Sequence, residues 1–144
     1  MFTDYSQTSD DGHNVICIGI SHEDGSLHMS WDLHSSEFNY RRSLVDLVSE
    51  PEQAEWTTES FGPVSHELPG LAQDMSEVSW ACLALAESQT TYPRFLSLPK
   101  SQGGALLLDL RTGISGLGDE WLFVYTQGAW RSLGVYLKGV QNNA

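Results

Sequence analysis

Two arginines occupy positions where a strand would normally carry an uncharged side chain. Arg94 lies in the middle of one apolar segment and Arg111 ends another, and the whole chain has only five arginines. A charged side chain on such a strand is costly to bury unless it has a partner. The sequence therefore indicates one of two uses: binding of an anion, or structural ion pairs with Asp109, Asp119 or Glu120.

A second polar group comes from a strictly alternating segment, residues 27–34. In an extended strand His28, Ser30, Asp32 and His34 fall on one face and the apolar residues on the other. We expect this polar face to be exposed, either lining a site or simply facing water. The spacing of its histidines fits neither helical nor zinc-finger ligands, so the sequence predicts no metal site.

The remaining reactive residues lack the surroundings that known catalytic motifs require. Cys17 and Cys82 have no neighbours at metal-binding spacing, and Cys17 lies in an apolar run that predicts a buried thiol. The glycine-rich loop after Arg111 has no Gly-Lys-Ser/Thr ending, so it does not match a phosphate-binding loop. The sequence also contains no G-x-S-x-G element.

The charge of the chain excludes some partners. Its 144 residues contain 7 basic and 19 acidic side chains, and the net charge is −12. Such a chain does not attract nucleic acid or anionic membrane surfaces. No apolar run approaches the roughly 18 residues of a membrane span, and the first residues do not resemble a signal peptide.

The elements that must position these residues are short strands joined by tight turns. Asp24-Gly25 predicts a hairpin, and the segment 71–87, rich in Ala, Leu and Glu, predicts a helix. The rhythm of the rest is typical of an all-β sandwich, barrel or propeller. The predicted strands cover residues 13–20, 27–34, 38–41, 92–98, 105–110, 120–126 and 129–133.

Several segments, taken in order from about Tyr5 to Asn143, resemble the BNR repeat-containing family of the BNR-4 type. The resemblance depends on the ordered set rather than on any single block. The matching segments are Asp10 to Asn14, Gly25 to His34, Phe38 to Arg41, Phe61 to Pro63, Thr91 to Phe95, Arg111 to Asp119 and Trp130 to Gly134.

This resemblance implies a β-propeller built from four-stranded antiparallel blades, seven in known members. At about 40–50 residues per blade, 144 residues hold about three blades. We therefore expect residues 1–144 to form a single, partial propeller domain, with residues 71–87 as an atypical insertion. The open sheet edges of a partial propeller favour self-association.

The resemblance extends to polysaccharide lyases of the ulvan and rhamnose–glucuronate type, which cleave beside a uronic acid by β-elimination. That reaction needs a base, an acid and a cation that neutralises the uronate carboxylate. By position in the family motifs, His13 and Tyr92 are expected to transfer protons. Arg111 and His34 are expected to bind and neutralise the carboxylate.

The same match assigns Asn14, Tyr40 and Arg94 to substrate contacts or to their support. It implies an acidic polysaccharide as partner, an extracellular location for the intact protein and no cofactor, with a structural cation such as calcium left open. Two alternatives also stay open: a sialidase-like glycoside hydrolase and a non-catalytic carbohydrate-binding module.

Overall fold

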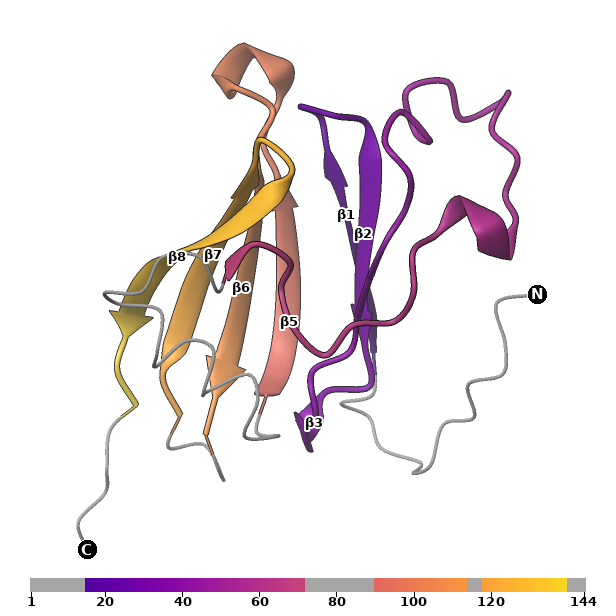
Figure 1. The fold of residues 1–144 in the computed structure, drawn as a ribbon. Coiled ribbons are helices and arrows are strands. Elements are labelled where there is room, and N and C mark those ends of the chain that lie inside the picture. Colours follow the sequence, from indigo (N-terminus) through magenta and orange to yellow (C-terminus); the bar gives the residue numbers. More distant parts are fainter. Residues whose placement is uncertain (1–14, 72–89, 114–117, 140–144) are drawn as a thin grey trace, which may run out of the picture.

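The fold is all-β, as expected, with two antiparallel sheets (Figure 1). The computed structural model describes residues 15–71, 90–113 and 118–139. The first sheet has the strand order β1 (Ile16–Ser21), β2 (Ser26–Trp31), β4 (Tyr40–Arg42). The second has the order β3 (His34–Ser36), β5 (Thr90–Ser97), β6 (Leu106–Thr112), β7 (Glu120–Thr126), β8 (Ala129–Leu137).

The four consecutive strands β5 to β8 form one antiparallel meander, which is the unit of a propeller blade. The length of the chain had predicted about three blades, whereas the described residues form two sheets. Two short 3₁₀ turns, η1 (Thr58–Ser60) and η3 (Lys100–Gln102), lie in the connections. Within this part of the chain, no helix is long and apolar enough to cross a membrane.

The helix predicted for residues 71–87 lies outside the described residues, except for Leu71. Leu71 is 3% exposed and packs in the core, which lies on the inner face of the five-stranded sheet. Alternate residues of β6, β7 and β8 supply most of that core, because every second side chain of a strand points to the same face. They are Leu106, Leu108, Leu110, Phe123, Tyr125 and Trp130.

The predicted strand 27–34 is in fact two strands that belong to different sheets. Asp32 has φ 58°, in the left-handed region, and this turn of the backbone ends β2. The chain then enters β3, which pairs with β5 of the second sheet. The alternation had predicted that His28 and His34 share one face. They do not, because they lie on strands of different sheets.

The polar face of β2 is buried rather than exposed, which corrects the second part of that prediction. His28 and Ser30 have no exposed surface, and Ser26 is equally buried. The His28 ring lies edge-on to Tyr125 at 4.4 Å and to Trp130 at 5.6 Å between ring centroids. This face packs against the five-stranded sheet, whose aromatic residues cover it.

A series of hydrogen bonds gives the buried polar groups of this face their partners and so offsets the cost of burying them. Trp130 Nε1 donates to the Tyr40 hydroxyl (3.0 Å), which lies 2.7 Å from His28 Nδ1. His28 Nε2 lies 2.8 Å from Ser26 Oγ, which donates to Asp24 Oδ1 at 2.6 Å. A neutral His28 protonated on Nε2 gives every hydroxyl in this series both a donor and an acceptor. We call these five residues the interior chain.

The turns of both sheets meet at one end of the molecule. The predicted Asp24-Gly25 hairpin is confirmed: Gly25 has φ 65°, and a Cβ there would lie 2.9 Å from the Asp46 Cα. In the same turn, Glu23 N donates to Gly104 O, and the Glu23 carboxylate accepts bonds from Thr126 Oγ1 and Gln127 N. These contacts hold the β1–β2, β5–β6 and β7–β8 turns together.

Candidate functional site

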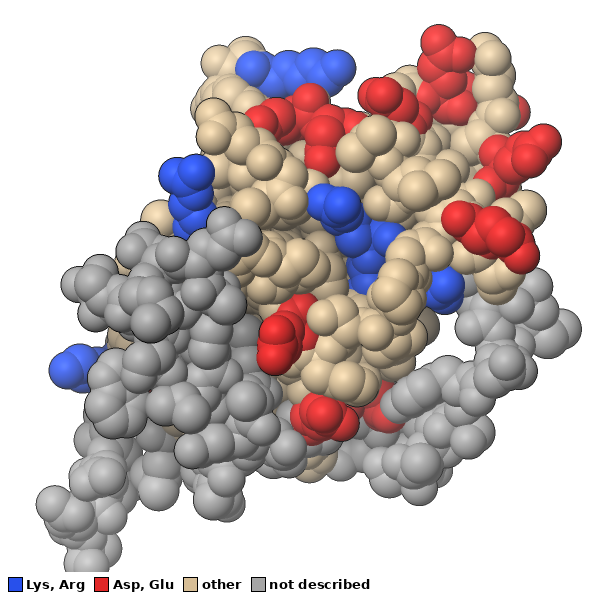
Figure 2. Space-filling view, viewed as in Figure 1, with Lys and Arg blue, Asp and Glu red and all other residues tan. Residues whose placement is uncertain are grey.

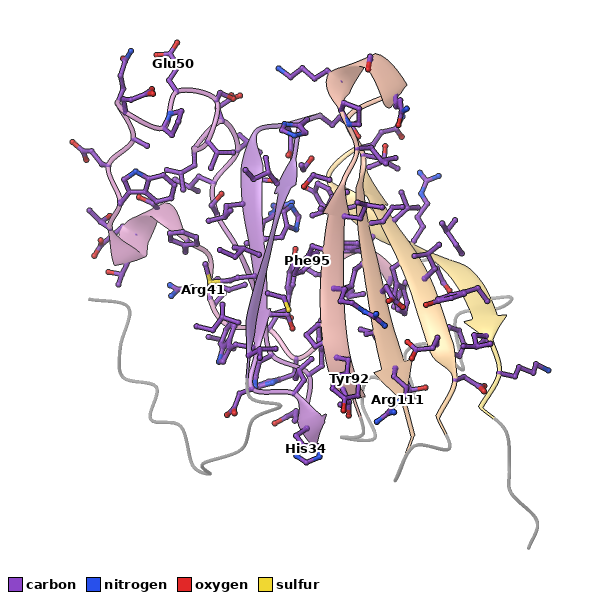
Figure 3. All side chains as sticks on the ribbon, turned by 180° about the vertical axis from the view of Figure 1, so that it is seen from behind. His34, Arg41, Glu50, Tyr92, Phe95 and Arg111 are labelled. Carbon is purple, nitrogen blue, oxygen red and sulfur yellow. The ribbon has the colours of Figure 1, made fainter. Side chains whose placement is uncertain are left out.

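The opposite end of the five-stranded sheet brings together residues from four strands. His34 is paired with Thr91, Thr91 with Arg111, and Arg111 with Glu120. Directly opposed residues of antiparallel strands are about 5 Å apart, so this row spans β3, β5, β6 and β7 within about 15 Å. Figure 3 shows His34, Tyr92 and Arg111 at this one end of the molecule.

A β-bulge presents Tyr92 beside this row. The pairing of β5 with β6 runs from Thr91↔Arg111 to Arg94↔Asp109, so β5 has one residue more than β6 in this interval. Tyr92 lies in the bulge with φ 57°, in the left-handed region. For an aromatic residue this backbone conformation is unfavourable and must be held by its surroundings. The Tyr92 side chain is 38% exposed.

Arg111 lies over the ring of Tyr92. Its guanidinium carbon is 4.9 Å from the ring centroid, which is a cation–π contact. Arg111 Nε is buried and has no hydrogen-bond partner among the described residues. The aromatic face of Tyr92 thus orients the guanidinium. We call His34, Tyr92 and Arg111 the strand-end cluster.

Arg94 makes the structural ion pair that the sequence had left as one of two options. Its Nε is 3.0 Å from Asp109 Oδ2, and its Nη2 is 3.8 Å from Glu120 Oε2. The Tyr136 hydroxyl donates to Asp109 Oδ1 at 2.9 Å. Burial raises the pKa of Glu120, and the charge of Asp109 raises it further, while Arg94 and Arg111 oppose the shift.

Of the other predicted site residues, Tyr40 is not part of this end. His13 and Asn14 lie outside the described residues. Tyr40 is 1% exposed, with its hydroxyl bonded to His28 and Trp130, so in this structure it cannot contact a bound sugar. Its motif neighbours predicted a site residue, but its partner Trp130 lies 90 positions along the chain and places Tyr40 in the core.

Sequence reasoning missed two residues at this end. Thr91 is fully buried and lies between His34 and Arg111 in the sheet. Tyr136 reaches Asp109, which is 27 residues earlier in the chain. Thr91 begins a segment that carries the family resemblance, but nothing in that segment singled it out, and no local pattern marks Tyr136; only the strand register places them here.

Among the described residues, no group of three or more His, Cys, Asp or Glu side chains is arranged to hold a metal ion. Cys17 is partly buried and its thiol donates to the Pro93 carbonyl at 2.7 Å. Burial raises the pKa of this thiol, which outweighs the opposing charge of Arg94. A thiol of this kind is a poor nucleophile.

One group of acidic side chains lies on the connection that follows β4. Figure 2 shows acidic side chains gathered at the upper right, over the connection 43–60 that follows β4. This connection contributes Asp46, Glu50, Glu52, Glu55 and Glu59. A polyanion would be repelled from that face.

Comparison with solved structures supports the propeller-like fold. The structure is similar to the crystal structure of polysaccharide lyase Uly1, with a TM-score of 0.61 and 23% sequence identity. The match covers 82% of this chain and 28% of the lyase chain, so the present chain spans well under a third of that protein. At this identity the likeness concerns the fold.

Curated proteins provided no match. A family model did match, over residues 1–144, and its description is BNR repeat-containing family member. The resemblance seen in the ordered sequence motifs is therefore confirmed, and the chain belongs to the BNR repeat-containing family.

Proposed function

We propose that this protein acts as a polysaccharide lyase, cleaving uronic-acid-containing polysaccharide by β-elimination at the strand-end cluster. The observation that carries the proposal is the stack of Arg111 on Tyr92 at the same end of the sheet as His34, with Thr91 between His34 and Arg111 in the row. It unites a guanidinium, a phenol and an imidazole. Each type suits one requirement of the reaction.

The proposed reaction begins at the carbon next to the uronate carboxylate. A base removes the proton from this carbon, and the electron pair forms a carbon–carbon double bond as the glycosidic oxygen leaves. An acid gives that oxygen its proton. Arg111, assisted by His34, stabilises the negative charge that builds on the carboxylate. Tyr92 and His13 share the two proton transfers.

The ion pairs of Arg94 argue against the alternative of a sialidase-like glycoside hydrolase. A sialidase-like site would need a cluster of arginines around the substrate carboxylate, but Arg94 is occupied by Asp109 and Glu120. Arg111 then remains the one described arginine in the strand-end cluster. A single arginine suits a uronate that is bound by a cation and a histidine.

The test is an incubation of the 144-residue chain with ulvan and with a rhamnose–glucuronate polysaccharide. Elimination creates a double bond conjugated with the carboxylate, so ultraviolet absorbance should rise with time. The matched variants are Arg111→Lys, which keeps the charge but loses the planar fork, and Arg131→Lys, an exposed arginine on β8 that serves as control. We expect the first to lose most of the activity and the second to retain it.

Two results would contradict the proposal. New reducing ends without any rise in absorbance would indicate hydrolysis. Binding of the polymer that persists in Tyr92→Phe, without turnover by the original chain, would indicate a carbohydrate-binding module.

A further inference from the structure

The strained bulge at Tyr92 is flanked by a pair of oppositely charged side chains. Immediately after the bulge, Arg94 of β5 is paired with Asp109 of β6 in the sheet register. Their side chains repeat this pairing, with 3.0 Å between Arg94 Nε and Asp109 Oδ2. Backbone and side-chain contacts therefore hold β5 to β6 at the same point.

The pair is tied to the two remaining strands of the meander. Arg94 Nη2 lies 3.8 Å from Glu120 Oε2 on β7, and Asp109 accepts the Tyr136 hydroxyl from β8. A single arginine thus links three strands, and its carboxylate partner links the fourth. An ion pair this exposed contributes little to stability, since the Arg94 side chain is 63% exposed. Its location next to a positive-φ residue gives it a geometric role instead.

We propose that Arg94 and Asp109 are positioning residues, which hold the bulge so that the Tyr92 ring stays beneath Arg111. Arg94 then orients the groups that act on substrate and does not itself bind the polymer, which is the supporting one of the two roles that the family resemblance left open for it. The kinetic consequence of this inference rests on the proposed function, while its structural consequence does not.

The structural consequence is tested with 3-fluorotyrosine in the full chain and ¹⁹F NMR, with the Tyr92 signal assigned by Tyr92→Phe. The ring lies next to a cation, so Arg111→Ala should shift its signal. Asp109→Asn and Arg94→Gln should shift the same signal in the same direction. Arg94→Lys, which keeps the charge pair, and Arg131→Gln, which removes an equal charge elsewhere on the sheet, should leave the signal near its original position.

An unchanged Tyr92 signal in both Asp109→Asn and Arg94→Gln would overturn the inference. If either variant folds poorly, the charge-reversed pair Arg94→Asp with Asp109→Arg decides the matter: the original signal should return in the double variant, and its failure to return also contradicts the proposal.

Kinetics then separate positioning from substrate binding. Arg94→Gln should lower kcat about 10- to 100-fold with KM within about twofold, because the reacting groups are misplaced while the substrate contacts remain. A raised KM at unchanged kcat would identify Arg94 as a binding residue and overturn the inference. The NMR measurement needs no turnover, so an inactive chain that still shows the predicted shifts contradicts the proposed function and supports the positioning role.

Discussion

The molecule contains two groups of polar side chains with opposite characters, the interior chain and the strand-end cluster. In the interior chain, His28 is fully buried and every polar group from Trp130 to Asp24 has its hydrogen-bond partner. In the strand-end cluster, His34 and Tyr92 are exposed and Arg111 Nε has no hydrogen-bond partner among the described residues. Both groups contain a histidine and a tyrosine, so residue type alone does not distinguish them.

The difference shows how burial decides the use of a polar side chain. A buried polar group that is fully bonded specifies the packing around it, and it has no capacity left for a ligand. Burial also lowers the pKa of His28 to about 3, with the nearby charge of Asp24 acting against the shift and that of Arg42 adding to it. His28 therefore stays neutral and cannot serve as a proton donor near pH 7. The strand-end cluster, by contrast, presents the exposed side chains of His34 and Tyr92 at an end of the sheet that a substrate can reach.

The largest expected effect is on activity and concerns Tyr92. Tyr92→Phe removes a proton-transfer group, so the elimination rate should fall about 10²- to 10⁴-fold. The free energy of unfolding should change by less than about 0.5 kcal/mol, since the hydroxyl is on an exposed side chain. Initial rates by absorbance and denaturant unfolding measure the two quantities. Retained activity would exclude Tyr92 from the chemistry.

The matched pair His28→Ala and His34→Ala tests the comparison through stability. His28→Ala leaves a cavity and two hydroxyls, of Ser26 and Tyr40, without their partner. It should therefore cost about 3 kcal/mol of unfolding free energy. His34→Ala, at the exposed strand end, should cost less than about 0.5 kcal/mol. Equal losses in urea unfolding would show that His28 is not the more structural of the two.

Acid should weaken the fold through His28. Its folded-state pKa of about 3 lies below the unfolded value near 6.5, so the unfolded state binds the proton more tightly. The contribution of His28 to the free energy of unfolding is complete above pH 6.5 and is lost as pH falls toward 3. Between pH 7 and 5 this amounts to about 2 kcal/mol.

Unfolding free energies at these two pH values measure the effect, and His28→Gln provides the control that removes the titrating group. The pKa of Asp24, which is lowered by bonds from Ser26 and Tyr125 against the effect of burial, adds a loss only at lower pH. A pH dependence that is as steep in His28→Gln as in the original chain would contradict this assignment.

The smallest expected effect concerns the outer end of the interior chain. The Tyr125 hydroxyl donates to Asp24 Oδ2 at 2.7 Å and accepts a bond from Arg42. Tyr125→Phe should cost only about 1 kcal/mol, because Asp24 and Arg42 are partly exposed and can bind water instead. A loss as large as that of His28→Ala would show that the hydrogen bonds at the outer end of the interior chain contribute as much to stability as those of His28.

Much of the fold could be predicted from the sequence, because strand periodicity and turn residues are local properties. The all-β class, most of the short strands, the Asp24-Gly25 hairpin and the family were predicted correctly. The break at Asp32 was not, since alternation continues through it and only its backbone φ reveals the change of sheet. The site residues stay a prediction: the register brings Tyr92, Arg111 and His34 to one end, while Tyr40 is buried in the core.

The sequence by itself determined the all-β class, the acidic charge and the residue types available for chemistry, since each depends on composition and short-range pattern. Only the tertiary structure decided which polar residues are buried and which are presented. His28 is interior because Tyr125 and Trp130, about 100 positions away, cover it. Tyr92 is presented because a bulge and its pairing partners on β6 hold it beneath Arg111. Contacts between residues so distant along the chain leave no local mark in the sequence.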